Sequence, residues 1–189
     1  MGERLRAVIQ HDYPEHMPES DLAINTGLRK GSQYALTWDM VDWKGRMLNI
    51  PRTWTKSKKP QHVSLNDAAL AARKAVRGSD GTPGRVFQSA KTGAALENSR
   101  HGFDDAVAKA GIKDFHWHDL RHTFASRLRM KGKSLGDICE LMGHGSLTMT
   151  MRYAHLGPNK LHEVVSALDS INTPVAPERQ ETVSSNYLQ

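Results

Sequence analysis

The chain has 189 residues, a length that allows one domain with a sizeable core and excludes a second large domain. It carries 26 Lys and Arg against 20 Asp and Glu, and its isoelectric point near 9.5 favours a polyanionic partner. Its single cysteine, Cys139, excludes an internal disulfide, and its apolar runs fall short of the roughly 20 residues that a membrane span requires. We therefore expect a reducing, cytoplasmic compartment and no membrane partner.

The first third of the sequence predicts short helices. Helical patterns cover 3–10 and 19–25, and the second pattern stops at Thr26-Gly27. This stop places Arg29 in a turn. Helical spacing then resumes and is expected to run over 31–38.

A small sheet is expected next. Residues 41–50 predict a hairpin around Lys44-Gly45, and the alternation in 53–55 and 62–65 predicts another hairpin on either side of a basic turn at Lys56. The sheet should be antiparallel, with about three strands.

The rest of the chain is predicted to be almost entirely helical. Glycines and capping residues separate the helical segments, which cover 66–76, 97–110, 118–130, 134–142, 148–154 and 158–168. A loop is expected over 78–84. The fold class is therefore α+β, mainly α: a helical domain over 1–170 with a small antiparallel three-stranded β-sheet. The polar segment 171–189 is expected to be a mobile C-terminal tail.

His118 and Arg121 stand three residues apart at a predicted helix start and therefore share one face of the helix. Because a histidine can move protons and an arginine can grip two phosphate oxygens, the pair suits phosphoryl chemistry. The same spacing also fits an exposed helix start without a function. His118 with His122 could in principle hold zinc, although no third ligand is apparent.

Further motifs follow in a fixed order along the chain. They are Thr26-Gly27-Leu28-Arg29-Lys30-Gly31, the basic hairpin at Lys56, His118-Asp119-Leu120-Arg121, Gly143-His144 and Tyr153. Together they resemble the tyrosine recombinases, also called phage-type integrases, over roughly residues 20–165. Five motifs in the right order and at compatible spacing are far more specific than any one of them.

The resemblance implies the catalytic domain of a site-specific recombinase, which breaks and rejoins DNA strands by transesterification. Tyr153 would attack a phosphodiester and form a 3′-phosphotyrosine, whose bond conserves the energy of the broken strand so that a 5′ hydroxyl can reverse the step. Arg29 and Arg121 would hold the two non-bridging oxygens. Neither a metal nor a cofactor is expected.

The remaining groups of this motif set would handle protons. A phenol with a pKa near 10 is a poor nucleophile at neutral pH, and His118 is the candidate base. By resemblance, Lys56 would protonate the leaving 5′ oxygen and His144 would hydrogen-bond the phosphate.

Four other basic residues receive lesser roles. Lys58 and Lys59 are expected to touch the DNA backbone in a salt-dependent contact without sequence preference. His122 and His155 are expected to be surface or supporting residues. The tryptophans are interpreted as packing residues rather than as platforms for DNA bases.

Two features depart from the family pattern. The family commonly has Glu three residues after the first arginine, where this chain has Ser32; that acid helps to order the site rather than to react. Only a short helix precedes the Arg29 region, so the N-terminal core-binding domain of full-length members is expected to be absent.

Family resemblance also implies partners. They are double-stranded DNA and further copies of the chain, in a tetramer on two duplexes. In this assembly the segment from Pro158 onward would dock onto a neighbouring subunit. The protein would be encoded by a bacterium or a phage and would be associated with the nucleoid. The sequence identifies no accessory protein.

Two rival functions remain. A DNA-binding module could keep the phosphate-gripping residues without cutting, with Ser32 as the reason for considering it. A type IB topoisomerase would use similar chemistry to relax supercoils, but the compact spacing before Tyr153 favours the recombinase.

Overall fold

The computed structural model describes residues 2–55, 58–74, 76, 84–89, 92–96, 100–159 and 161–168. The chain divides into a unit that ends at Pro158 and a second unit that begins at Asn159, and each is described by itself. Lys56, most of the predicted loop over 78–84 and the predicted tail over 171–189 lie outside the described residues.

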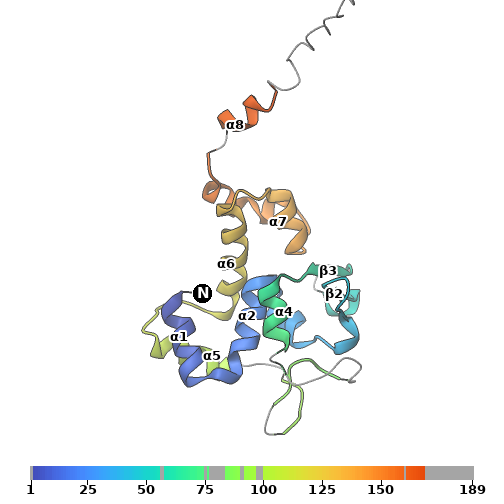
Figure 1. Ribbon diagram of the computed structural model, residues 1–189, viewed down its shortest axis with the longest axis vertical. Helices are drawn as coiled ribbons and strands as arrows, with labels where there is room; N and C mark the ends of the chain where they lie inside the picture. The colour runs from blue at the N-terminus through green and yellow to red at the C-terminus, as the bar shows by residue number, and fades with distance from the viewer. Residues whose placement is uncertain are drawn as a thin grey trace, which may run out of the picture. The chain divides into compact units, whose positions relative to one another are not determined.

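The first unit is mainly helical (Figure 1). Its α-helices are α1 (Glu3–Asp12), α2 (Met17–Thr26), α3 (Lys30–Tyr34), α4 (Asp67–Lys74), α5 (Arg100–Lys109), α6 (Trp117–Met130) and α7 (Leu135–Leu141). Short 3-10 segments lie between the regular elements: η1 (Pro14–His16), η2 (Trp38–Met40), η3 (Arg52–Trp54), η4 (Leu147–Met149) and η5 (Met151–Leu156). The second unit contains α8 (Leu161–Ser166). Among the described residues, no helix combines the length and the apolar character that crossing a membrane requires.

A three-stranded antiparallel sheet completes the first unit. Its strands are β1 (Val41–Asp42), β2 (Met47–Ile50) and β3 (Gln61–Ser64), in the order β1-β2-β3. Leu48 of β2 lies opposite Val41 on one side and Val63 on the other, and all three side chains are buried. The sheet and the high helix content confirm the predicted fold class.

Three predicted elements differ from the structure. The strand expected at 53–55 is the 3-10 segment η3, because Pro51 ends β2 and its carbonyl oxygen accepts from the Trp54 N–H at 3.0 Å. The helix expected over 31–38 ends at Tyr34, because Thr37 forms a β-bridge with Arg85. The third difference concerns the segment that carries Tyr153 and is described with the site.

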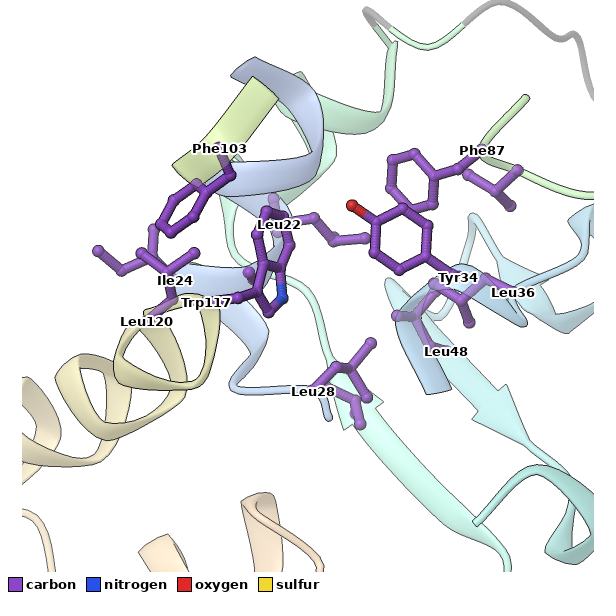
Figure 2. Close-up of a cluster of buried hydrophobic side chains, with 14 of the residues drawn as sticks. Leu22, Ile24, Leu28, Tyr34, Leu36, Leu48, Phe87, Phe103, Trp117 and Leu120 are labelled. Atoms are coloured by element: carbon purple, nitrogen blue, oxygen red, sulfur yellow. The ribbon is translucent and has the colours of Figure 1, made fainter. Parts of the chain in front are cut away.

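The main core is rich in aromatic side chains (Figure 2). The ring of Trp117 lies 4.9 Å from Phe103 in an edge-on arrangement and 5.9 Å from Tyr34, and all three are buried. As predicted, Trp38 and Trp117 are packing residues, whereas Trp54 is 45% exposed with the Arg85 guanidinium over its ring. Because Trp117 is the first residue of α6, the core fixes the start of that helix.

Helix α6 joins this core to a second, smaller apolar cluster. At its start, the His116 N–H donates to the Asp119 carboxylate at 2.7 Å in a capping box. In Figure 1 the helix extends from the region of α2 to α7, and it packs against both. Ala125 of α6 contributes to the second cluster with Met142 and Tyr153. The residues that follow Trp117 on α6 are therefore held between two packed regions.

Candidate active site

One pocket of about 370 Å³ gathers most of the residues that the sequence predicts to be functional. Its lining residues are Arg29, His118, Arg121, His122, Met142, His144, Thr148, Met149, Arg152 and Tyr153. We call it the arginine pocket. It brings together five of the predicted site residues from four separate segments. Lys56 lies outside the described residues. Lys58 and Lys59 lie in the exposed segment before β3 and are not among the lining residues.

Arg121 is buried, with 3% of its surface exposed. Its guanidinium donates one hydrogen bond to the Gly27 carbonyl and another, at 2.6 Å, to the Met142 carbonyl. Burial lowers its pKa to about 10, and the neighbouring charge of Arg29 acts in the same direction. Arg121 therefore stays cationic at neutral pH, and two backbone carbonyls fix the orientation of its forked donors.

Arg29 enters the pocket from the turn between α2 and α3. The turn forms because α2 ends at Gly27, whose backbone adopts the left-handed conformation with φ +62°. Arg29 is partly buried, burial lowers its pKa, and its guanidinium donates to the Gly143 carbonyl at 3.4 Å. The turn expected at Arg29 is confirmed.

His144 is placed by the way in which α7 ends. The Gly143 N–H donates to the Glu140 carbonyl and the His144 N–H to the Cys139 carbonyl at 3.0 Å, which is the Schellman pattern of a helix C-terminus. Gly143 has φ +59°, as this pattern requires. The motif predicted from Gly143-His144 thus has a backbone cause, because the glycine turns the chain so that the histidine reaches the pocket.

The His144 ring is held by a hydrogen bond of 2.8 Å between its Nδ1 and the Oγ1 of Thr150, a fully buried residue. Burial, followed by the charges of Arg121 and Arg29, lowers the His144 pKa to about 4. The imidazole is therefore neutral at pH 7. In the tautomer in which Thr150 donates to Nδ1, the Nε2 of His144 carries a hydrogen that it can donate to an anion.

Tyr153 lies on η5 and is 4% exposed. The α-helix predicted over 148–154 is wrong, because two 3-10 segments meet at Thr150. The Thr150 N–H donates to the Leu147 carbonyl and the Tyr153 N–H to the Thr150 carbonyl, and this three-residue spacing is that of a 3-10 helix. The Tyr153 hydroxyl lies 2.5 Å from the Nδ1 of His122. Burial raises the Tyr153 pKa, and the charges of Arg152 and Arg121 oppose this rise.

The two histidines of α6 lie edge to face, with ring centroids 4.9 Å apart. His118 is the more open of the two, and the loss of part of its hydration, followed by the charges of His122 and Arg121, lowers its pKa. The described residues contain no group of three or more His, Cys, Asp or Glu side chains arranged to hold a metal ion.

Sequence reasoning left two basic lining residues out of the site, His122 and Arg152. His122 follows His118 by four residues and so shares its helix face, a signal that the sequence offered. Ser32, which replaces the usual acid, lies outside the lining and donates from its Oγ to the Trp54 carbonyl at 3.0 Å.

The pocket is strongly electropositive. Its lining includes three arginines and three histidines, and none of the described lining residues is Asp or Glu. Cations held without a carboxylate partner favour an anionic ligand. A phosphate group that enters the pocket can meet the side chains of Arg29 and Arg121 and the Tyr153 hydroxyl.

Comparisons with known proteins agree with this geometry. The model of the phage integrase family matches residues 12–160. The chain is 33% identical over 166 residues to the integrase of Salmonella phage P22, covering 80% of this chain and 42% of that protein. The catalytic domain of bacteriophage HP1 integrase superposes with a TM-score of 0.70 at 27% identity, covering 93% of this chain and 98% of the domain.

The chain thus spans about two fifths of the P22 integrase. The fold also matches the Tn1549 transposon integrase, with a TM-score of 0.71 at 21% identity over 89% of this chain and 63% of the other. Because the family model matches more than half of the chain, and the HP1 catalytic domain is matched over nearly its whole length, the chain belongs to the phage integrase family of tyrosine recombinases.

Proposed function

We propose that this chain is the catalytic domain of a site-specific DNA recombinase that cuts and rejoins strands through a 3′-phosphotyrosine at Tyr153. The observation that carries the proposal is the arginine pocket, in which the Tyr153 hydroxyl shares one cavity with Arg29 and Arg121. The Tn1549 transposon integrase, whose fold this chain shares, was solved in complex with a circular intermediate DNA. Double-stranded DNA is accordingly the proposed substrate.

The pocket's charge supports the proposed first step. A phosphodiester gains negative charge as a nucleophile approaches, and donors placed where that charge develops lower the barrier. Arg121 is held by two backbone carbonyls and Arg29 by one, so both would meet the two non-bridging oxygens with little reorganisation. His144, neutral and oriented by Thr150, would donate to the same phosphate.

Two proton transfers complete the step. As the Tyr153 oxygen bonds to phosphorus, the phenolic proton would pass to a histidine of α6, for which the sequence prediction named His118. As the bond between phosphorus and the 5′ oxygen breaks, that oxygen would take a proton from Lys56, a role that rests on the resemblance. In the reverse direction a 5′ hydroxyl attacks the phosphotyrosine and restores the strand.

Residues 1–170 form the proposed catalytic domain and 171–189 the proposed tail. For the tetramer implied by the resemblance, we propose that the segment after Pro158 docks onto a neighbouring subunit. This proposal is supported by exposed apolar side chains in and just after α8. Those that are more than half exposed are Leu161, Val164, Val165 and Leu168. We place the activity in the bacterial cytoplasm, at the nucleoid, where the DNA substrate lies.

A nicked suicide substrate tests the proposal. Once the strand is cut next to the nick, a short fragment diffuses away and the covalent intermediate accumulates. With EDTA present, denaturing electrophoresis should show a protein–DNA band for the wild type and none for Tyr153→Phe. A chain that binds DNA and forms no adduct would instead support the non-cleaving module, and Ser32→Glu would then test whether the missing acid is the cause.

A further inference from the structure

The Tyr153 hydroxyl interacts with the side chains of His122 and Arg152, and of these two His122 is the one that can accept a proton. The Tyr153 oxygen and the His122 Nδ1 are 2.5 Å apart, a short distance for an oxygen–nitrogen hydrogen bond. The contact joins η5 to α6, two elements that pack against each other. No hydrogen bond joins Tyr153 to His118 in the described part of the chain, where the His118 ring instead packs edge-on against His122.

From this geometry we infer that His122, rather than His118, accepts the phenolic proton when Tyr153 attacks DNA. The inference rests on the proposed function and assigns one of its proton transfers to a residue that the sequence prediction had left outside the site. A candidate base must lie within hydrogen-bond reach of the proton that it removes, and His122 meets this condition before substrate arrives.

The electrostatic surroundings suit an acceptor. Burial, followed by the charge of Arg152, lowers the His122 pKa, so the ring is neutral at pH 7. In the tautomer that carries its hydrogen on Nε2, the Nδ1 has a free lone pair directed at the Tyr153 hydroxyl. The charges of Arg152 and Arg121 disfavour a protonated His122 when the pocket is empty. A bound phosphate would offset the charge of the His122 imidazolium, so that His122 accepts the proton more readily once DNA is bound.

In the cleavage step one bond to phosphorus forms as another breaks, and each proton has a donor and an acceptor. The Tyr153 oxygen forms its bond to phosphorus, the phenolic proton moves to the His122 Nδ1, and the bond between phosphorus and the 5′ oxygen breaks. The 5′ oxygen takes its proton from Lys56, as in the proposed function. In the joining direction His122 returns its proton to the Tyr153 oxygen as that oxygen leaves phosphorus.

Two variants separate proton acceptance from positioning. His122→Asn places an amide oxygen near the position of Nδ1, so it can accept the hydrogen bond and cannot take up the proton. His122→Ala removes both functions. Both should slow adduct formation by roughly 10²- to 10⁴-fold, the usual contribution of a general base. His155→Asn, the same change at an exposed histidine two residues from Tyr153, is the control and should stay within about twofold.

A modified substrate distinguishes the base from the acid. When sulfur replaces the bridging 5′ oxygen, the leaving thiolate needs no proton, so Lys56→Ala should recover adduct formation. His122→Asn should stay slow with this substrate, because the nucleophile still has to lose its proton. DNA affinity and the thermal unfolding midpoint are measured alongside, so that a variant that has lost its fold is not counted as slow.

The pH dependence gives a second, independent readout. The wild-type rate should level off near neutral pH, once His122 is unprotonated. In His122→Ala the rate should keep rising with pH toward the Tyr153 pKa, which burial raises above the ordinary phenol value of about 10, because the tyrosine must then ionise unaided. Added imidazole should partly restore the rate of His122→Ala near pH 7.

The outcomes are distinct. The assignment of His122 is supported if the wild type forms an adduct that Tyr153→Phe does not form, and if His122→Asn reacts slowly both with the ordinary substrate and with the sulfur-containing substrate. If His122→Asn and His122→Ala react within about threefold of wild type with unchanged pH profiles, the assignment fails while the proposed function stands. If the folded wild-type chain binds DNA and forms no adduct, the proposed function fails first.

Discussion

The carbonyl oxygen of Gly27 accepts a hydrogen bond from the buried guanidinium of Arg121, so the C-terminal end of α2 helps to orient the proposed phosphate-binding group on α6. Gly27 can do this because it adopts φ +62°, which other residues reach only with strain. The space beside it is also closed, since an added Cβ would clash with the Phe124 ring. Stability and the site therefore depend on the same residue.

Gly27→Ala should lower the free energy of unfolding by about 1–3 kcal/mol from backbone strain alone, with the Phe124 contact adding to the loss. Adduct formation should slow as well, because Arg121 loses its fixed partner. Gly31→Ala is the control: an added Cβ there meets nothing within 4 Å, and alanine favours the helix. Denaturant unfolding gives the free energy of unfolding of each variant. Equal values for Gly27→Ala and Gly31→Ala would show that Gly27 is not required by its conformation and surroundings.

Stability should also depend on pH through His16. Its Nδ1 lies 3.1 Å from the buried carboxylate of Glu19, which also accepts from the Tyr34 hydroxyl at 3.0 Å. The hydrogen bond to Glu19 raises the His16 pKa. A raised folded-state pKa stabilises the fold below the unfolded value of about 6.5, and this contribution is lost as the pH rises through the folded value.

The difference in unfolding free energy between wild type and His16→Gln should therefore be largest below pH 6.5 and shrink at higher pH. Taking the difference is necessary, because His118, His122 and His144 have lowered pKa values and act with the opposite sign. A difference that stays constant from pH 5 to pH 9 would mean that the His16 and Glu19 pair does not titrate with folding.

Thr150 should matter for catalysis through His144. Thr150→Val keeps the buried shape and removes the hydroxyl that holds the His144 Nδ1, so the ring loses its fixed tautomer. We expect adduct formation to slow roughly tenfold, which corresponds to one lost hydrogen bond. Thr150→Ser retains the hydroxyl and should recover most of the rate. If valine and serine variants react alike, the contact has no catalytic role.

The arginine pocket should bind inorganic phosphate without DNA. Phosphate that binds only the folded chain raises its unfolding temperature, by an amount that grows with the logarithm of the ratio of phosphate concentration to Kd. The rise should be reduced in Arg29→Gln and preserved in Lys44→Gln, which removes the same charge from the turn between β1 and β2. Equal responses in both variants would point to general screening of the chain's positive charge rather than to this pocket.

Much of the pocket could be predicted because its residues lie in motifs with recognisable local spacing. The stop at Gly27, the start of α6 and the turn at Gly143 are all backbone features that short patterns indicate, and each places a predicted residue. The three-stranded sheet followed from alternation in the same way.

The missed features depend on contacts between distant segments. His122 shares a helix face with His118, a pattern visible in the sequence, but its partner Tyr153 lies 31 residues later. Alternation over 53–55 could not distinguish a strand from the turn of η3, since Pro51 and its carbonyl decide between them. Apolar spacing over 148–154 likewise could not show that two 3-10 segments replace one α-helix there and meet at Thr150.

The most direct test of the proposed function is to identify the residue that carries the DNA. Adduct formed on the suicide substrate in the presence of EDTA would be digested with nuclease and protease and analysed by mass spectrometry. If Tyr153 is the nucleophile, a phosphodiester-linked nucleotide remnant will be found on the peptide that contains Tyr153, and Tyr153→Phe will form no adduct. A remnant on another residue, or folded and DNA-bound protein without any adduct, would contradict the proposed function.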